Sequence, residues 1–378
     1  MNDLVSLRLF PSKFSHPSYF HFATDKLDFS WTNAVDFPCF CHLIQLTWNR
    51  IITPEADEFV MMFNSLFTNS HSTRFLLCCS LSFPLLIRSI RFQFTADFGE
   101  APRRTNNTRW FGDYEVIQQV KKFLPRLFAW IKDNKNISNA DLREKFLGTL
   151  FPGSPKLAAL EVELALLEVV GKKLYSAAYI LEGDGELAFQ SYELFQLIRT
   201  TLGTREFAQV SELKKNPMNK GKNLGAEVET RLKPALLYWA AKLGEHKQAV
   251  RIFEAARILS PTAMKKNPIT AEDAAAVLGH LPKKWRTSSN TAMISELNDF
   301  LKALKDEPEC LIKVSQFWTR HAASMPILSG LVKILMTIQP SSAAAERVFS
   351  RFGSSFNSKQ TNVLTETIAT SLMLQCNQ

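Results

Sequence analysis

Apolar residues recur at helical spacing through most of the chain after residue 100, and this spacing constrains its fold more than any other feature. Residues 114–132 show it best, through Val116, Ile117, Val120, Phe123, Leu124, Leu127, Phe128 and Ile131. Such a stripe is typical of an amphipathic helix that buries one face. Comparable stripes predict helices at 155–174, 186–202, 227–243, 245–259, 294–305, 311–321, 327–336, 342–352 and 365–374. The expected fold class is therefore mainly α.

Proline and basic polar residues mark the expected breaks between these helices. Pro125 should kink the helix over 114–132 or start a new one, because proline removes a backbone donor inside a helix. Linkers are predicted at 214–223, 261–268 and 282–290. They are short enough to join helices within one compact unit.

Residues 1–103 have a different pattern. Ile90, Phe92 and Phe94 alternate with polar residues, which favours a short strand, and the apolar run 75–77 is a second candidate. Helical periodicity is poor and the local cues disagree with one another, which argues against a well-specified fold. We expect a poorly ordered N-terminal segment.

Charge and cysteine content limit the classes of partner. The formal net charge of +9 favours an anionic partner such as DNA, although a solvated basic surface explains it equally well. The six cysteines are few and scattered, as in a protein of a reducing compartment. Cys39, Cys41 and His42 lie close together, but no second pair follows at zinc-finger spacing, so no metal site is predicted.

Other classes of protein find no support in the sequence. The most apolar stretch, residues 75–87, is too short to span a membrane, so a soluble protein is expected. The sequence contains no GxxxxGK[ST], GxGxxG, HExxH or GxSxG pattern. We therefore predict no small-molecule substrate.

The most specific motif lies near the C-terminus. Phe317 and Trp318 are followed by MPIL at 325–328 and by IQPSSAAAERVFS at 338–350. In content and order these pieces resemble the C-terminal region of hAT-superfamily DNA transposases. Weaker similarities at 108–110 (TRW), at 181–185 and at 255–261 extend the resemblance to residues 104–378.

The resemblance implies an organisation of the chain. Residues 104–307 would form a helical insertion domain, and residues 308–378 a C-terminal dimerisation region containing the last helices of a split ribonuclease-H-like core. Residues 1–103 would remain the poorly ordered segment. The resemblance also implies a nuclear location and a homo-oligomer.

The resemblance further suggests site residues. In the family, three carboxylates bind two divalent metal ions, and Glu346 matches the third of them. Trp110 matches a tryptophan that stacks on a flipped base, and Arg109 precedes it. The alternative roles are an ordinary helix carboxylate for Glu346 and an anchor of the first helix for Trp110.

Catalysis is expected to be incomplete, because a lone carboxylate does not hold two Mg²⁺ ions. The first two carboxylate motifs of the family are not found in residues 1–100. Glu346 is then vestigial and no cofactor is expected; Mg²⁺ or Mn²⁺ would be needed only by an active enzyme. Two alternatives stay open: an active transposase with its aspartates hidden in residues 1–100, and a non-functional gene fragment.

The remaining candidates concern DNA binding and self-association. Besides Arg109 and Trp110, a non-specific DNA surface would use Lys283, Lys284 and Arg286. Self-association would use the apolar side chains of the C-terminal region, namely Leu328, Leu331, Leu335, Val348 and Phe349. The sequence alone leaves open whether these side chains are buried within the chain or against a second copy.

Overall fold

The computed structural model of the protein describes residues 37–68, 83–103, 105, 111–134, 137, 139–286, 289–307 and 313–342. Contacts between residues divide the chain into two units. The C-terminal unit comprises Met1–Ile44, Ala177–Leu197 and Ala240–Gln378. The central unit comprises Gln45–Ser176 and Ile198–Trp239.

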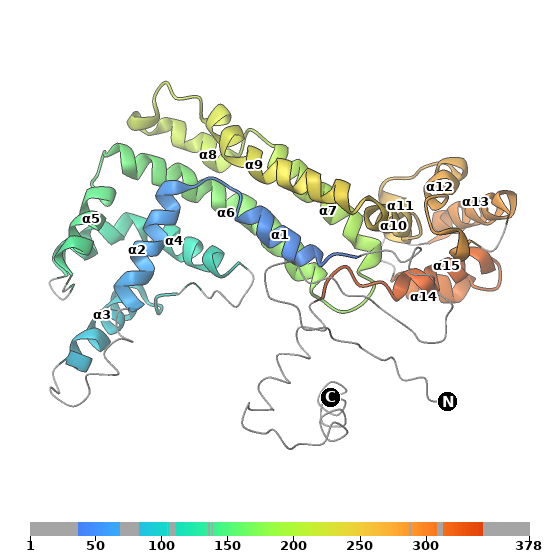
Figure 1. Cartoon of the computed structure of the whole chain (residues 1–378), viewed down its shortest axis with the longest axis horizontal. Helices are drawn as coiled ribbons and strands as arrows, with labels where there is room; N and C mark the ends of the chain where they lie inside the picture. The colour runs from blue at the N-terminus through green and yellow to red at the C-terminus, as the bar shows by residue number, and fades with distance from the viewer. Residues whose placement is uncertain are drawn as a thin grey trace, which may run out of the picture. The chain divides into compact units, whose positions relative to one another are not determined.

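Every regular element in these described ranges is a helix, and Figure 1 labels the α-helices. They are α1 (Phe40–Trp48), α2 (Pro54–Thr68), α3 (Phe83–Phe98), α4 (Gly112–Asp133), α5 (Ala140–Leu150), α6 (Pro155–Leu181), α7 (Ala188–Gly203), α8 (Ala208–Glu212), α9 (Leu224–Glu245), α10 (Lys247–Ile258), α11 (Pro261–Lys266), α12 (Ala271–Leu278), α13 (Asn290–Asp306), α14 (Val314–His321) and α15 (Pro326–Met336). Short 3-10 turns are η3 (Leu213–Lys215), η4 (Pro217–Asn219) and η5 (Lys283–Trp285).

Several helices begin at a side chain that caps their first turn. The side chains of Asn139, Ser260, Thr270 and Ser289 accept backbone N–H groups at the starts of α5, α11, α12 and α13, respectively. These bonds satisfy donors that have no partner inside the helix. Local sequence therefore fixes where these four helices start.

The central unit has a core rich in phenylalanine. Helix α2 packs against α3, α4 and α5. The ring of Phe94 on α3 lies 5.8 Å from Phe63 and 5.2 Å from Phe67 of α2, and 5.7 Å from Phe123 of α4. These edge-to-face contacts, together with burial, stabilise the packing of the three helices.

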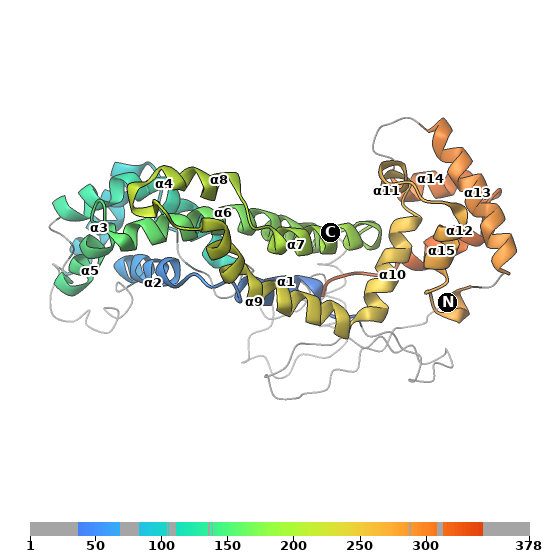
Figure 2. The same ribbon diagram turned by 90° about the horizontal axis from the view of Figure 1, so that it is seen from above.

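The C-terminal unit is built around α10 and α12–α15, which Figures 1 and 2 show gathered together. Phe300 of α13 packs on Phe317 and Trp318 of α14 at 5.5 and 5.0 Å. The Trp318 indole donates a hydrogen bond to the Leu259 carbonyl at 2.8 Å. The aromatic pair of the C-terminal motif therefore belongs to the core of this unit.

The expectation of a mainly α fold is confirmed, since the described residues are helical and contain no strand. The ribonuclease-H-like core requires a sheet, and these residues do not show one. Helix α4 runs through Pro125 without a new helix starting there. The helices expected at 342–352 and 365–374 lie outside the described residues, apart from Ser342.

The strand expected around residues 90–94 is wrong, because these residues belong to α3. In a strand Ile90, Phe92 and Phe94 would share one face. In the helix, Ile90, Phe94 and Phe98 lie four residues apart on the buried face, and Phe92 is 75% exposed. The described parts of the N-terminal segment form α1, α2 and α3, so the expectation of poor order does not hold there.

Two further differences concern short segments. The linker expected at 261–268 contains α11, which starts at Pro261 because proline is well suited to the first position of a helix. Helices α5 and α12 were not predicted. The linker at 214–223 contains η3 and η4, and the one at 282–290 contains η5.

Candidate functional site

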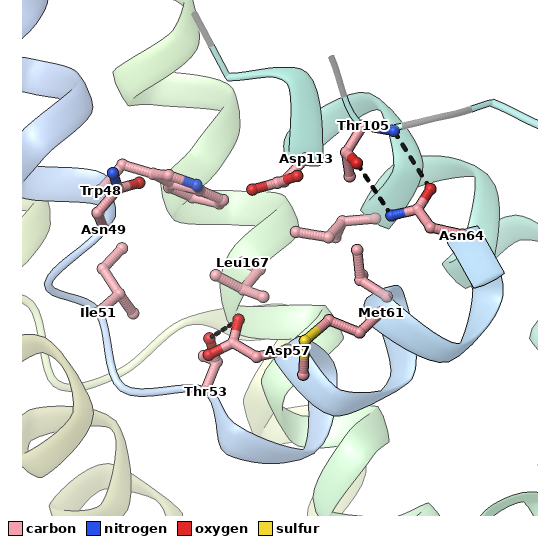
Figure 3. A pocket seen from close by; sticks show the side chains of 12 residues that line it. Trp48, Asn49, Ile51, Thr53, Asp57, Met61, Asn64, Thr105, Asp113 and Leu167 are labelled. Atoms are coloured by element: carbon pink, nitrogen blue, oxygen red, sulfur yellow. Dashed lines mark hydrogen bonds between the residues drawn. The ribbon is translucent and has the colours of Figure 1, made fainter. Parts of the chain in front are cut away.

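A cavity of about 410 Å³ opens in the central unit. Figure 3 shows the side chains that line it. They come from the end of α1 and the following loop, from α2, α4 and α6, and from Thr105. The residues are Trp48, Asn49, Ile51, Thr53, Asp57, Val60, Met61, Asn64, Thr105, Asp113, Ile117 and Leu167.

Six of the twelve side chains that line this cavity are apolar and six are polar. Trp48, Ile51, Ile117 and Leu167 are buried side chains that also belong to the core of the central unit. At one edge Asn64 and Thr105 exchange two hydrogen bonds, of 3.1 and 3.2 Å. These two polar groups satisfy one another, so they hold the loop at Thr105 against α2.

Two carboxylates face the cavity from different helices. Figure 3 shows Asp113 of α4 on one side of Leu167 and Asp57 of α2 on the other. The Thr53 hydroxyl donates a hydrogen bond to Asp57 at 3.3 Å. Partial burial raises the pKa of both carboxyls, and the charge of Asp113 raises the pKa of Asp57 further. Among the described lining residues there is no Lys or Arg to offset these charges.

The second candidate site is the region of the C-terminal motif, where Glu296 organises α15. The carboxylate of Glu296 on α13 accepts the backbone N–H groups of Ile327 and Leu328 at 3.0 and 2.9 Å. Its negative charge also favours the N-terminus of a helix. Glu186 binds the start of α14 in the same way, through Val314 and Ser315 at 2.8 and 2.6 Å. Sequence analysis missed both glutamates, because each lies far along the chain from the helix it caps.

The apolar face of α15 is buried within the chain itself. Leu328, Leu331 and Leu335 are almost fully buried in the C-terminal unit, where α15 packs against α13 and α14. The sequence left open whether these three leucines are buried within the chain or against a second copy. In the structure they are buried within the chain. Any self-association surface of this region must therefore use other side chains.

The other predicted residues are brought together only in part. Lys283 and Lys284 are exposed on η5, and the neighbouring Arg286 is half-buried. The Nε of Arg286 is buried, and it has no hydrogen-bond partner among the described groups. Arg109, Trp110, Glu346, Val348 and Phe349 lie outside the described residues.

Cys39 and Cys41 lie at the start of α1. The backbone N–H of Ser342 donates to Cys39 Sγ at 3.5 Å, and the Cys41 thiol donates to the Ala178 carbonyl at 3.4 Å. Hydrogen bonding with Cys41 lowers the pKa of Cys39 to about 6, whereas the same contact and burial raise the pKa of Cys41. Within the described part of the chain, no three His, Cys, Asp or Glu residues are grouped so as to hold a metal ion.

All regular elements of the described chain are helices. The first pieces of its most specific sequence motif lie in α14 and at the start of α15, the two helices that Glu186 and Glu296 cap. Residues 296–377 match the model of the hAT family C-terminal dimerisation region. The protein is therefore related to hAT-family transposases, as the motif at 338–350 predicted. No curated protein matches the chain. None of the helices in the described ranges has the length and apolar character needed to cross a membrane.

Proposed function

We propose that this protein is a transposase derivative that associates with a second copy of itself through its C-terminal region. The observation that carries the proposal is the match of residues 296–377 to a dimerisation region. The hydrogen bonds of Glu186 and Glu296 fix the starts of α14 and α15 in this region. Since Leu328, Leu331 and Leu335 are buried, Val348 and Phe349 remain the candidates for the contact between copies.

Sedimentation velocity of the full chain tests this proposal. We expect a species heavier than the 42.9 kDa monomer at tens of micromolar. The double variant Val348→Asp, Phe349→Asp should sediment as a monomer and keep the circular dichroism of the wild type. Phe92→Asp is the matched control, because Phe92 is exposed on α3 in the central unit. A wild type that stays monomeric would exclude self-association.

The proposal includes the loss of transposase chemistry. Transfer of a DNA strand by two metal ions needs several carboxylates around Glu346. The family places two of them on strands, and the described residues before 104 form α1–α3 instead. Asp57 lies on α2, and Asp97 at the end of α3 accepts a hydrogen bond from the Trp130 indole at 2.8 Å. The C-terminal helices would then be the remains of a split ribonuclease-H-like core.

A strand-transfer assay on the full chain with Mg²⁺ or Mn²⁺ separates this proposal from an active enzyme. We expect no product. Metal-dependent product that Glu346→Gln abolishes would establish the transposase alternative. The remaining alternative, a gene fragment without function, predicts that the full chain does not unfold cooperatively in urea.

Non-specific DNA binding in the nucleus completes the proposed function. It is supported by the net charge of +9 and by exposed Lys283 and Lys284 on η5. Lysines at phosphates contribute affinity that is independent of sequence and dependent on salt. We expect self-association to position two such surfaces on one DNA molecule.

A further inference from the structure

We propose that the cavity of the central unit binds an organic cation, an ammonium or guanidinium group carried on a short apolar stem. This binding site is separate from the proposed self-association and DNA binding, because all of its described lining residues lie in the central unit. The volume of about 410 Å³ is in the range of pockets that bind small ligands.

The negative charge of the cavity indicates that its ligand is a cation. Asp57 and Asp113 come from two helices and face the same space. No basic side chain is present among the described lining residues, so the structure offers these carboxylates no internal counter-ion. The charge of Asp113 also disfavours the ionised form of Asp57. A bound cation would relieve this repulsion, while an anion would increase it.

The walls of the cavity decide the kind of cation. Trp48, Ile117 and Leu167 present buried apolar surface next to the carboxylates. An aromatic ring attracts ammonium and guanidinium groups, and aliphatic walls favour a hydrocarbon stem. A bare Mg²⁺ or Ca²⁺ ion needs six or more oxygen ligands at short distance. Within the described part of the chain, no third His, Cys, Asp or Glu is grouped with these two carboxylates, so they suit an organic cation better than a metal ion.

The polar groups at the edge do not change this charge pattern. Asn64 and Thr105 are hydrogen-bonded to each other, and Asn49 accepts a hydrogen bond from Gln45. None of them carries a positive charge. Asp57, Asp113 and Met61 keep a large part of their surface exposed, whereas Trp48 and Leu167 are buried. A cationic chain can therefore enter with its stem against the buried wall and its charge near the carboxylates.

Two sources supply this chemistry: a free diamine or guanidine, and a Lys or Arg side chain of another protein. Isothermal titration calorimetry of the full chain distinguishes them with two probes. Agmatine carries a guanidinium and an amine on a butyl stem, and an acetylated, amidated Gly-Arg-Gly peptide carries the guanidinium on a peptide. Saturable binding of agmatine alone points to a free amine, and tighter binding of the peptide points to a protein side chain.

Matched variants identify the cavity as the site. Asp57→Asn and Asp113→Asn should each weaken binding by about tenfold or more, because each removes one charged partner of the ligand. Asp141→Asn on α5 makes the same change at an exposed carboxylate that does not line the cavity, and it should bind like the wild type. Circular dichroism and urea unfolding confirm that each variant is folded.

Several results would overturn the proposal. One is the absence of saturable binding of either probe by the folded wild type. A second is unchanged binding by the double variant Asp57→Asn, Asp113→Asn. A third is equal affinity for 1-pentanol, which has a stem without a charge. A fourth is tight binding of Mg²⁺ that displaces agmatine.

Discussion

Glu163 of α6 and Arg231 of α9 form an ion pair in the central unit, with 2.6 Å between Glu163 Oε1 and Arg231 Nη1. The Glu163 side chain is fully buried, and its other oxygen accepts the backbone N–H of Ala56 at 2.7 Å. Burial raises the pKa of Glu163, whereas the Ala56 N–H and Arg231 act in the opposite direction. The charged carboxylate therefore depends on Arg231 to offset the cost of its removal from water.

Removal of Arg231 should strongly destabilise the fold. In Arg231→Met the buried carboxylate loses its cation, and we expect the free energy of unfolding at pH 8 to fall by about 3–5 kcal/mol. Urea unfolding followed by circular dichroism measures this loss. Arg205→Met is the control, because the pair of Arg205 with Glu229 is exposed and should contribute less than about 1 kcal/mol. Equal losses in the two variants would contradict this role of Arg231.

The destabilisation by Arg231→Met should shrink as the pH falls from 8 to 5. Without the guanidinium, burial raises the pKa of Glu163 further above its value in the unfolded chain. A carboxyl with a raised folded-state pKa binds its proton more tightly in the folded state, so folding gains stability as the pH falls through that pKa. Urea unfolding of the wild type and of Arg231→Met at both pH values measures this loss in the free energy of unfolding. A larger loss at pH 5 than at pH 8 would refute the argument.

Glu296 should control the stability of the region that matches the hAT model. Glu296→Ala removes the acceptor of the Ile327 and Leu328 N–H groups, and each charge-assisted bond contributes about 1.5–3 kcal/mol. We expect lower unfolding free energy and weaker self-association in sedimentation. Glu272→Ala removes an exposed glutamate from the first turn of α12 and serves as control. If both variants behave alike, Glu296 has no special role.

Cys39 should react as a thiolate near neutral pH. Its pKa of about 6 depends on the hydrogen bond with Cys41, so the pH profile of iodoacetamide alkylation should have its midpoint near that value. Mass spectrometry of the modified peptide follows the reaction. In Cys41→Ala the midpoint should move up toward about 8.5, the value of a free thiol. Cys41→Ser keeps a hydroxyl donor, and it should shift the midpoint less than Cys41→Ala does.

DNA binding should depend steeply on salt and use η5. Fluorescence anisotropy of the full chain with duplexes of unrelated sequence should give similar affinities that fall linearly with log salt concentration. Lys283→Gln with Lys284→Gln should reduce that slope by about 2, one unit for each lost phosphate contact. The control is Lys302→Gln with Lys305→Gln, which removes the same charge from exposed positions of α13. Sequence-selective or salt-insensitive binding would contradict non-specific recognition.

Sequence predicted the helices whose apolar stripe is long, and it failed where spacing is ambiguous. The stripe of α4 is regular over its whole length, whereas Ile90 and Phe94 fit a two-residue spacing with Phe92 and a four-residue spacing with Phe98. Only the packing of Phe94 against Phe63 and Phe67 decides between them. The motif at 338–350 correctly indicated the family, because it is a local string that needs no tertiary information.

The cavity and the glutamate caps were not predictable from sequence, because both depend on distant segments. Trp48, Asp113 and Leu167 meet in the cavity although long stretches of chain separate them. Glu296 caps a helix that begins at Pro326. No pattern in the neighbourhood of these residues distinguishes them from ordinary surface carboxylates or core residues. Their roles arise from helix packing, which local patterns in a single sequence do not reveal.

Binding of an organic cation in the cavity should weaken as the pH falls. The ionisable side chains that line it are Asp57 from α2 and Asp113 from α4; α6 contributes Leu167, and the loop contributes Thr105. Both carboxyls have a raised pKa, so as the pH falls they become protonated and neutral at a higher pH than a free aspartate does. Calorimetry with agmatine, which keeps its charge throughout, should show the affinity falling between pH 7 and pH 4. An affinity that is constant over this range would mean that the carboxylates do not hold the ligand.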